Sequence, residues 1–224
     1  MKVSENLRML QEKVNVACKR SNRDPEEVKI IAVTKYVTTE RALEAIECGV
    51  THLGENRDEG LLEKWNTIGD KPTWHFIGTL QTRKVKNIID KVDYIHSLDR
   101  ESLAKEINAR AGDRTISCFV QVNASGEESK HGLTPEMVVP FIKELEKFPK
   151  IRVEGLMTMA PFTEDATIIR QCFQTLKKLQ LEIQHIDLPY APCKELSMGM
   201  SNDFEIAIEE GATMIRIGTA LVGE

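Results

Sequence analysis

The stretch Val28-Lys29-Ile30-Ile31-Ala32-Val33-Thr34-Lys35 decides the fold of this chain. It begins as an almost unbroken apolar run rich in β-branched residues, which is typical of a strand buried on both faces. It ends in Lys35, at the carboxyl end of the strand, where α/β folds place their chemistry. A partly desolvated lysine is a good nucleophile there. Taken alone, the stretch also fits a solvated lysine that merely ends a strand, so the other strand ends decide.

The composition is that of an ordinary globular protein. The chain has 224 residues, 41% of them hydrophobic and 29% charged, with a net charge of -5. This length fits one α/β barrel, so we expect a single domain over residues 1–224. An acidic chain argues against a nucleic-acid partner, and no apolar run approaches the roughly 20 residues that cross a membrane. Because the N-terminus also lacks an apolar signal core, we expect a cytoplasmic protein.

Neither the cysteines nor the histidines form a metal or disulfide pattern. The five cysteines contain no CxxC pair and lie mostly in apolar surroundings, which indicates reduced packing residues. The five histidines are scattered through the sequence without the spacing of metal ligands. We therefore expect no metal site.

Helix and strand patterns alternate along the whole chain. After a helical stripe over residues 5–20 and the strand at 28–35, strand patterns recur at residues 50–54, 73–77, 94–97, 115–122, 151–157, 195–198 and 213–217. Eight strand–helix units without a linker predict a closed (β/α)8 TIM barrel. A doubly wound open sheet is the alternative, because a strand count from sequence can err by one or two.

Unusual residues stand at the ends of these predicted strands. A barrel gathers the carboxyl ends of its strands on one face, so they are expected to lie together. The candidate site residues are Lys35, Asn56, His75, Met157, Ser197, Met198, Gly199, Met200, Ser201, Arg216, Gly218 and Thr219.

The last two strand ends fit a phosphate site. Ser201 precedes the helical pattern at residues 202–209, so its hydroxyl and the first free amides can meet an anion. Gly199 and Gly218 let the backbone approach a ligand closely, and Thr219 adds a second hydroxyl. Each residue alone also fits a cap or a turn. It is the two loops together, the usual phosphate cradle of a barrel, that favour phosphate.

A phosphate cradle, a strand-end lysine and an arginine within one barrel suggest pyridoxal 5'-phosphate (PLP) bound as a Schiff base. Several motifs resemble those of the pyridoxal phosphate homeostasis protein family, which looks like the alanine racemase N-terminal domain standing alone. They are Ala32-Val33-Thr34-Lys35, Gly54-Glu55-Asn56, His75-Phe76-Ile77-Gly78-Thr79-Leu80-Gln81, Gly155-Leu156-Met157-Thr158-Met159, Leu196-Ser197-Met198-Gly199-Met200-Ser201 and Arg216-Ile217-Gly218-Thr219. The resemblance runs from near residue 5 to the C-terminus.

The resemblance implies a role for most of the candidate residues. Lys35 would carry the Schiff base, Asn56 and Met157 would line the ring with His75 near it, Arg216 would face the pyridine nitrogen, and Ser201, Gly218 and Thr219 would hold the phosphate. The chain departs from the family at Arg83, where asparagine is frequent, and at Val222, where phenylalanine is frequent. Neither change touches the implied cofactor contacts.

An arginine at the pyridine nitrogen limits the chemistry of the site. It stays protonated and disfavours a proton on the ring nitrogen, which leaves the ring a weak electron sink. Racemisation also needs an acid or base on each face of the substrate carbon, and Lys35 serves one face. In alanine racemase a tyrosine from a separate C-terminal domain serves the other. This chain ends at Glu224, so we expect that domain to be absent, and none of the three tyrosines matches its role by motif.

The sequence therefore favours a non-catalytic PLP carrier over an enzyme. The resemblance implies buffering or delivery of PLP, with effects on amino-acid and keto-acid metabolism, by a monomer. A slow amino-acid racemase is the second hypothesis, and an aldolase-like Schiff-base barrel acting on sugar phosphates is the third. The basic segment Arg83, Lys84, Lys86 and Lys91 is interpreted as a solvated helix face, with docking of PLP-dependent apoenzymes as the alternative.

Overall fold

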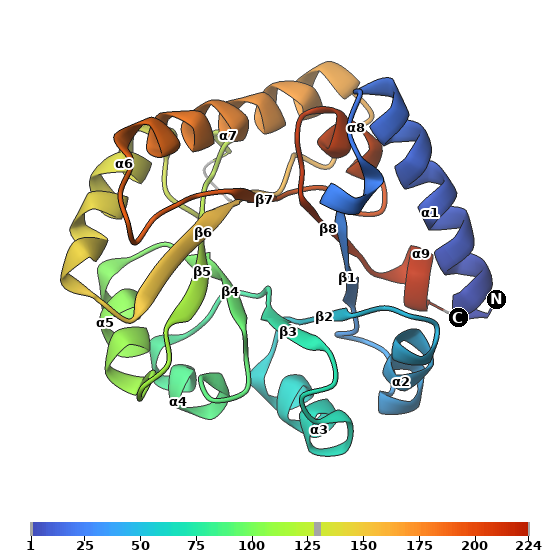
Figure 1. Cartoon of the computed structure of the whole chain (residues 1–224), viewed down its shortest axis with the longest axis horizontal. Helices are drawn as coiled ribbons and strands as arrows, with labels where there is room; N and C mark the ends of the chain where they lie inside the picture. Colours follow the sequence, from blue (N-terminus) through green and yellow to red (C-terminus); the bar gives the residue numbers. More distant parts are fainter. Residues whose placement is uncertain (1, 128–130, 224) are drawn as a thin grey trace.

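Eight parallel strands close into a barrel in which each strand pairs with its neighbours in chain order (Figure 1). The computed structural model describes residues 2–127 and 131–223; Met1, residues 128–130 and Glu224 of the predicted domain lie outside the described residues. The strands are β1 Lys29–Val33, β2 His52–Glu55, β3 Thr73–Phe76, β4 Tyr94–Leu98, β5 Ile116–Gln121, β6 Ile151–Met157, β7 Glu195–Ser197 and β8 Met214–Ile217. The predicted (β/α)8 barrel is confirmed, and the open sheet is wrong.

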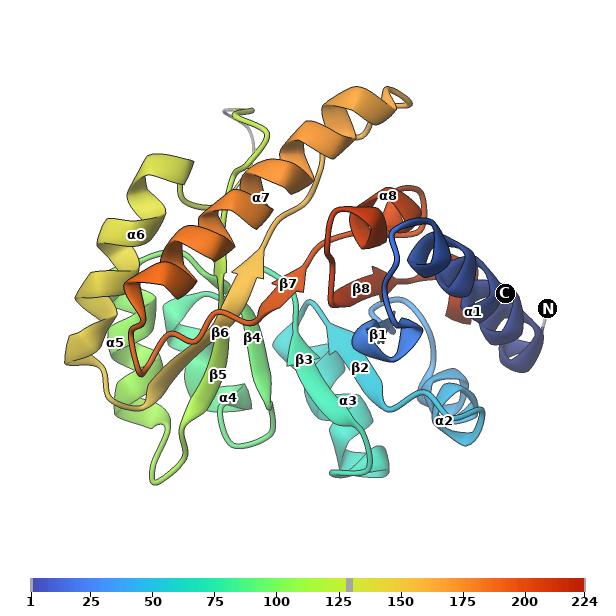
Figure 2. The same ribbon diagram turned by 45° about the horizontal axis from the view of Figure 1, so that its top comes forward.

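Helices surround the barrel on the outside (Figures 1 and 2). They are α1 Val3–Arg20, α2 Thr39–Glu47, α3 Asp58–Ile68, α4 Val85–Ile88, α5 Glu101–Arg110, α6 Pro135–Glu144, α7 Ala166–Ile186, α8 Phe204–Glu209 and α9 Thr219–Val222, with 3-10 turns at Pro25–Glu27, Thr82–Lys84 and Leu145–Lys147. The predicted basic helix face at Arg83, Lys84, Lys86 and Lys91 is therefore divided between a 3-10 turn, the short α4 and the residues that follow it. Helix α1 packs on α8 and α9, beside the loops that follow the last two strands.

The apolar residues form two cores, one on each face of the sheet. Ala32 belongs to the large core between the strands and the helices, whereas its neighbour Ile31 belongs to a small cluster inside the barrel. This alternation follows from the pleat of a strand, which turns successive side chains to opposite faces. It explains why the first strand reads as a continuous apolar run: both of its faces are buried.

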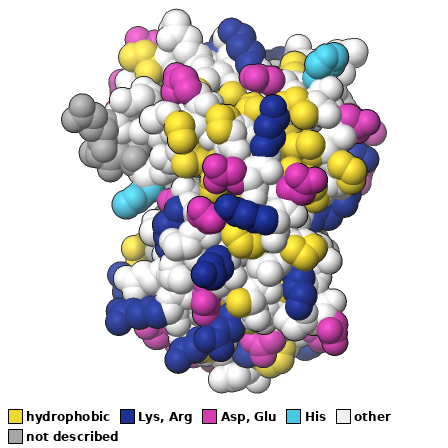
Figure 3. Space-filling view, turned by 90° about the vertical axis from the view of Figure 1, so that its left-hand side faces the viewer, with side chains coloured by type: hydrophobic (Ala, Val, Ile, Leu, Met, Phe, Trp, Pro, Cys, Tyr) yellow, Lys and Arg dark blue, Asp and Glu magenta, His cyan; other side chains and the backbone are white. Residues whose placement is uncertain are grey.

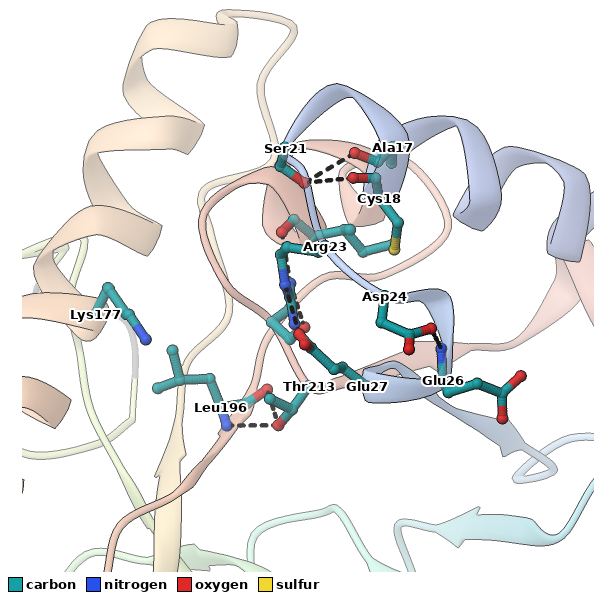
Figure 4. Close-up of polar contacts among 12 residues, drawn as sticks. Ala17, Cys18, Ser21, Arg23, Asp24, Glu26, Glu27, Lys177, Leu196 and Thr213 are labelled. Carbon is teal, nitrogen blue, oxygen red and sulfur yellow. Dashed lines mark hydrogen bonds and ion pairs between the residues drawn. The ribbon is translucent and has the colours of Figure 1, made fainter.

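The pairing between β7 and β8 is the shortest in the barrel, counted in paired residues. Only Ser197 and Met214 form a register pair along it. Beside that pair, the Thr213 hydroxyl accepts a hydrogen bond of 2.8 Å from the amide of Leu196 (Figure 4). The Thr213 amide also donates to the Leu196 carbonyl oxygen at 3.0 Å, so side chain and backbone together close this part of the seam.

Arg23, just after α1, holds the segment between α8 and β8 (Figure 4). Its Nη1 donates to the carbonyl oxygens of Ile208 at 2.7 Å and Ala212 at 2.9 Å, and its Nε donates to Glu27 at 3.1 Å. These bonds hold the last turn of α8 and the loop that follows it. The connection between β7 and β8 is therefore anchored to the N-terminal part of the chain.

Two searches of the described residues bear on ligands and membranes. None of the helices there has the length and apolarity that a bilayer-crossing helix needs. The same part of the chain holds no group of three or more His, Cys, Asp or Glu side chains that could bind a metal ion. All five cysteines are free, and four of them are buried, as expected for packing residues.

Candidate cofactor site

Lys35 lies in the turn that follows β1, two residues beyond the end of the strand. Its side chain is exposed at the carboxyl end of the barrel, and its Nζ lies 4.9 Å from the ring centroid of Tyr36, which is 78% exposed. A cation over an aromatic face is attracted by the ring quadrupole. The structure therefore puts the predicted lysine at the mouth of the barrel, where a small molecule can reach its amine.

A buried ion pair anchors the turn that carries Lys35. Thr34 Oγ1 donates a hydrogen bond of 2.6 Å to Glu55 Oε1, and Lys64 Nζ lies 3.0 Å from the same oxygen. All three side chains are almost fully buried. Sequence reasoning missed this group, although a glutamate directly after a buried strand was a signal. Glu55 precedes Asn56, so the group holds the ends of β1 and β2 together.

Arg216 is the buried cation of the candidate site. It is 5% exposed, and its Nη1 donates to Ser197 Oγ at 2.6 Å while its Nη2 donates to the carbonyl oxygen of Thr158 at 2.9 Å. Burial lowers the pKa of Arg216 to about 10, and the carboxylate of Asp203 opposes that shift. The guanidinium group is therefore still charged at neutral pH, and two bonds fix its orientation.

His75 lies inside the barrel and is fully buried. It is hydrogen-bonded at 2.9 Å to His52 on one side and at 2.9 Å to His96 on the other, and His96 is bonded at 2.9 Å to Ser197. Three of the histidines that look scattered in the sequence are thus contiguous in space. The signal that could have found them is their position on the consecutive strands β2, β3 and β4.

Met157 lies in the apolar cluster inside the barrel, 1% exposed, where Ile31, Phe119 and Met214 surround it. Tyr94 packs against this cluster. The cluster fills the barrel interior, so a ligand at the mouth would rest on an apolar floor. The place of Met157 beside a ring stays a prediction, and the apolar floor is compatible with it.

The loops after β7 and β8 bring Ser201 and Thr219 to one cavity of about 340 Å³. Its other lining residues are Asn6, Met9, Leu10, Lys13, Phe204, Ala220 and Gly223. Within the described part of the chain, no protein group hydrogen-bonds either hydroxyl. Lys13, on α1, was not among the candidates, because nothing in its sequence context distinguishes it from other surface lysines. Lys35, Asn56 and Arg216 do not line this cavity.

The residues between Ser197 and Ser201 shape the first of these loops. Met198 is fully buried, whereas Met200 is 38% exposed. Gly199 has a φ of +94°, and a Cβ there would lie 2.6 Å from the Cβ of Ala207. Only glycine tolerates both the left-handed backbone and that approach. The Gly199 carbonyl also accepts a bond of 2.9 Å from the amide of Arg216, which couples the loop to β8.

The predicted basic face is largely neutralised. Lys84 Nζ lies 2.5 Å from Asp58 and 2.7 Å from Glu59, and Lys91 Nζ lies 2.8 Å from Asp90. On the face that Figure 3 shows, basic and acidic side chains also alternate with apolar ones. The structure thus gives no uniform positive field over this segment, and docking there stays an expectation without support.

The closed parallel barrel with a lysine at its mouth and a buried arginine defines the class of alanine-racemase-type barrels. The family described as "Alanine racemase, N-terminal domain" matches residues 6–224. Within that class, the chain belongs to the pyridoxal phosphate homeostasis protein family, as its motifs predicted. The pyridoxal phosphate homeostasis protein of Aquifex aeolicus is 42% identical, over 100% of this chain and 99% of the relative. That of Haemophilus influenzae is 34% identical, over 100% and 96%.

Solved structures agree with this family. PipY of Synechococcus elongatus PCC7942 with PLP bound has a TM-score of 0.84 and 31% identity, over 99% of this chain and 100% of that one. An alanine racemase of Clostridium difficile 630 has a TM-score of 0.78 at 19% identity, and the match covers 97% of this chain and 56% of the racemase. At that identity the likeness shows the fold alone.

Proposed function

We propose that this chain binds PLP and acts in PLP homeostasis as a carrier. The observation that carries the proposal is Arg216, a buried cation near the end of β8 whose orientation is fixed by hydrogen bonds to Ser197 Oγ and to the carbonyl oxygen of Thr158. A cation held in this way suits the unprotonated nitrogen of a pyridine ring. The family names of the relatives, and the PLP bound to PipY, support the same cofactor.

The residues present fit PLP by the chemistry of their groups. Lys35 offers an accessible amine to the aldehyde, and Ser201 and Thr219 offer to the phosphate hydroxyls that have no hydrogen-bond partner among the described residues. The remaining proposed contacts are Asn56, His75 and Met157 toward the ring, Gly218 toward the phosphate, and Ser197, Met198, Gly199 and Met200 as the loop that supports them. The hydrogen bonds from Ser201 and Thr219 to a phosphate would be charge-assisted, and such bonds are about twice as strong as neutral ones.

When bound, PLP supplies an aldehyde that condenses with amines and a ring that can withdraw electrons from them. Arg216 acts on the second property: as a cation it disfavours a proton on the ring nitrogen, which weakens electron withdrawal. Lys35 acts on the first: its exposed amine can capture the aldehyde and release it again to water or to another amine. These two residues together favour holding the cofactor over using it.

The tyrosines do not supply the second base that a racemase needs. Tyr94 is stacked on His75 inside the barrel with ring centroids 4.7 Å apart, and Tyr190 Oη donates to the carbonyl oxygen of Lys143 at 3.2 Å, far along the outer layer. Tyr36 shares the turn with Lys35, and its ring centroid lies 4.9 Å from the Lys35 Nζ, so it comes from the same loop as the first base. Losing a positioned acid or base costs about 10²–10⁴ in rate. We therefore propose a carrier that donates PLP to apoenzymes, without substantial racemisation.

Two assays test this proposal on the purified chain loaded with PLP. In the first, the chain is mixed with an apo transaminase, and recovery of transaminase activity is followed against free PLP at the same concentration. In the second, the optical rotation of L-alanine is followed over hours. We expect transfer of PLP without racemisation. Rapid racemisation without transfer would establish the racemase instead, and absence of PLP binding would refute both.

A further inference from the structure

A continuous chain of hydrogen bonds crosses the inside of the barrel and ends at Arg216. His52 Nδ1 and His75 Nε2 lie 2.9 Å apart, as do His75 Nδ1 and His96 Nε2, and His96 Nδ1 and Ser197 Oγ. Ser197 Oγ in turn accepts the bond of 2.6 Å from Arg216 Nη1. These residues come from β2, β3, β4, β7 and β8, so the chain connects strands that are distant in the sequence.

The two central histidines are neutral. His75 and His96 are fully buried, and burial lowers the pKa of each well below its ordinary value, with a further contribution from the neighbouring histidine. Aromatic rings hold both imidazoles: His75 is stacked on Tyr94 at 4.7 Å, and His96 on Phe119 at 4.3 Å. A neutral imidazole has one N–H donor and one bare acceptor nitrogen. Each histidine therefore donates in one direction along the chain only.

Ser197 decides which direction this is. Its oxygen already accepts a hydrogen bond from Arg216, and among the described residues its hydroxyl has one remaining neighbour, His96 Nδ1. A buried hydroxyl proton without an acceptor costs about 1–3 kcal/mol, so the hydroxyl donates to His96 Nδ1. His96 must then carry its proton on Nε2 and donate to His75 Nδ1. By the same logic His75 donates from Nε2 to His52 Nδ1.

The far end of the chain reaches water. His52, at the first position of β2, is half-buried, and its Nε2 has no partner among the described side chains. The single unpartnered polar side-chain atom found buried in the described part of the chain is Ser97 Oγ, so His52 Nε2 is accessible to solvent. The ion pair of Lys29 and Glu195, with a separation of 2.6 Å, and the carboxylate of Asp93 lie around this end.

We propose that His52, His75, His96 and Ser197 are positioning residues for Arg216, forming a one-way hydrogen-bond chain that holds its guanidinium group in place from inside the barrel. This inference rests on the proposed function only for its consequence, which is that Arg216 is presented to the ring nitrogen of PLP. Every hydroxyl and N–H of the chain donates away from Arg216, toward the N-terminal end of the barrel. Arg216 thereby always meets the lone pairs of Ser197 and never its proton.

The first test is made on the protein without PLP. Histidine ring ¹⁵N shifts report which nitrogen carries the proton. His131 and His185, which are exposed and not part of the hydrogen-bond chain, give reference signals. We expect His52, His75 and His96 all as the neutral Nε2–H form at pH 8. Signals of an Nδ1–H form or a cation at His75 or His96 would overturn the direction of the chain.

The second test separates positioning from mere packing. In Ser197→Ala, His96 loses its donor and Arg216 its acceptor, so we expect mixed tautomers at His96 and merged Nη resonances from a guanidinium group that rotates freely. Ser97→Ala removes the same atom from a serine on β4 that is equally buried but unpartnered, so it is the matched control and leaves both signals unchanged. Ser197→Thr keeps the hydroxyl and should restore the wild-type signals. Identical spectra for the two alanine variants would refute the inference.

The third test connects the chain to PLP. Because a hydrogen bond to a charged group is lost, Ser197→Ala should raise the dissociation constant for PLP about ten- to a hundredfold, while Ser97→Ala leaves it unchanged. An unchanged constant in Ser197→Ala would refute the positioning role. Wild-type protein that shows the expected tautomers but binds no PLP would refute the proposed function alone, since the tautomers are measured without the cofactor.

Discussion

Gly78 lies directly against the backbone of Asn56. A Cβ at Gly78 would come within 2.3 Å of the Asn56 carbonyl oxygen and 2.8 Å of its Cα. Side chains do not approach backbone so closely, so only glycine lets the loop after β3 pass the loop after β2. The contact fixes the height of Asn56 at the mouth of the barrel, although neither residue is hydrogen-bonded to the other.

Replacing Gly78 by alanine should therefore displace the Asn56 loop. The overpacking is expected to lower the free energy of unfolding by about 1–3 kcal/mol, which a urea titration measures. Thr79→Ala changes an exposed neighbour in the same loop and should stay within about 0.5 kcal/mol of wild type. Equal stability of the two variants would show that the loop yields freely.

Lys64→Met should leave Glu55 as an uncompensated buried charge. Breaking a buried pair on one side costs about 3–5 kcal/mol, and we expect a loss of that size in the free energy of unfolding. Adding Glu55→Gln should recover part of the loss, because the charge is then removed. Arg8→Met, which breaks an exposed pair with Glu12, is the control and should cost about 0–1 kcal/mol. A loss in Lys64→Met no larger than this control would contradict the pairing.

Lys35 should be the lysine that borohydride reduction labels with PLP. Its amine is exposed at the carboxyl end of the barrel, where the other proposed contacts gather. Peptide mapping of the reduced protein should place the label on Lys35 and show none in Lys35→Ala. Lys71→Ala, an exposed lysine just before β3, should keep the full label. Full-yield labelling at another lysine in Lys35→Ala would refute the assignment.

Ser201 and Thr219 should distinguish PLP from pyridoxal, which lacks the phosphate. Each hydroxyl bond to a charged group contributes roughly 1.5–3 kcal/mol, so the double alanine variant should bind PLP at least a hundredfold more weakly. Its affinity for pyridoxal should change little. A matched double variant, Ser4→Ala with Thr167→Ala, removes two exposed hydroxyls elsewhere. Equal losses for PLP and pyridoxal would place the phosphate at another site.

Asp58 should make stability depend on pH in the acid range. Burial raises the pKa of Asp58, but hydrogen bonds from Lys84 and Asn87 outweigh it and lower the pKa to about 2. A carboxylate with a depressed pKa stabilises the fold above its unfolded pKa of about 3.9, and this stabilisation is lost as pH falls toward 2. Asp58→Asn should thus cost about 1.5–3 kcal/mol at pH 7 and far less at pH 2.

The control for this titration is Asp90→Asn, whose carboxylate is 67% exposed beside Lys91. An exposed pair contributes about 0–1 kcal/mol. Denaturant unfolding at pH 7, 4 and 2 compares both variants with wild type. A cost for Asp58→Asn that is the same at every pH would show that the carboxylate does not titrate in this window.

The fold was predictable because its signal is local. Ile31 and Ala32 read as buried on both faces from their residue types alone, and the same pattern recurs at each strand. The positions of Arg216 near the end of β8 and of Lys35 just beyond β1 followed from that count. Strand ends were less certain: the first strand ends at Val33, so Lys35 belongs to a turn.

The contacts inside the barrel were not predictable in the same way. His52, His75 and His96 are more than 20 residues apart in sequence, and only the register of closed strands brings their nitrogens to 2.9 Å. The Glu55–Lys64 pair depends on how α3 returns over β2, which no local pattern encodes. Long-range polar contacts of this kind need the closed topology first.

The narrow seam between β7 and β8 has a mechanical consequence. With Ser197 and Met214 as its only register pair, this seam depends on few backbone bonds, among them those from Thr213 to Leu196 and from Met198 to Met214. Local opening begins where such bonds are few. We therefore expect amide hydrogen exchange in the barrel wall to be fastest along this seam, where β7 and β8 separate transiently. Because this seam lies between the two loops that carry Ser201 and Thr219, each opening would weaken both proposed hydrogen bonds to a phosphate at once.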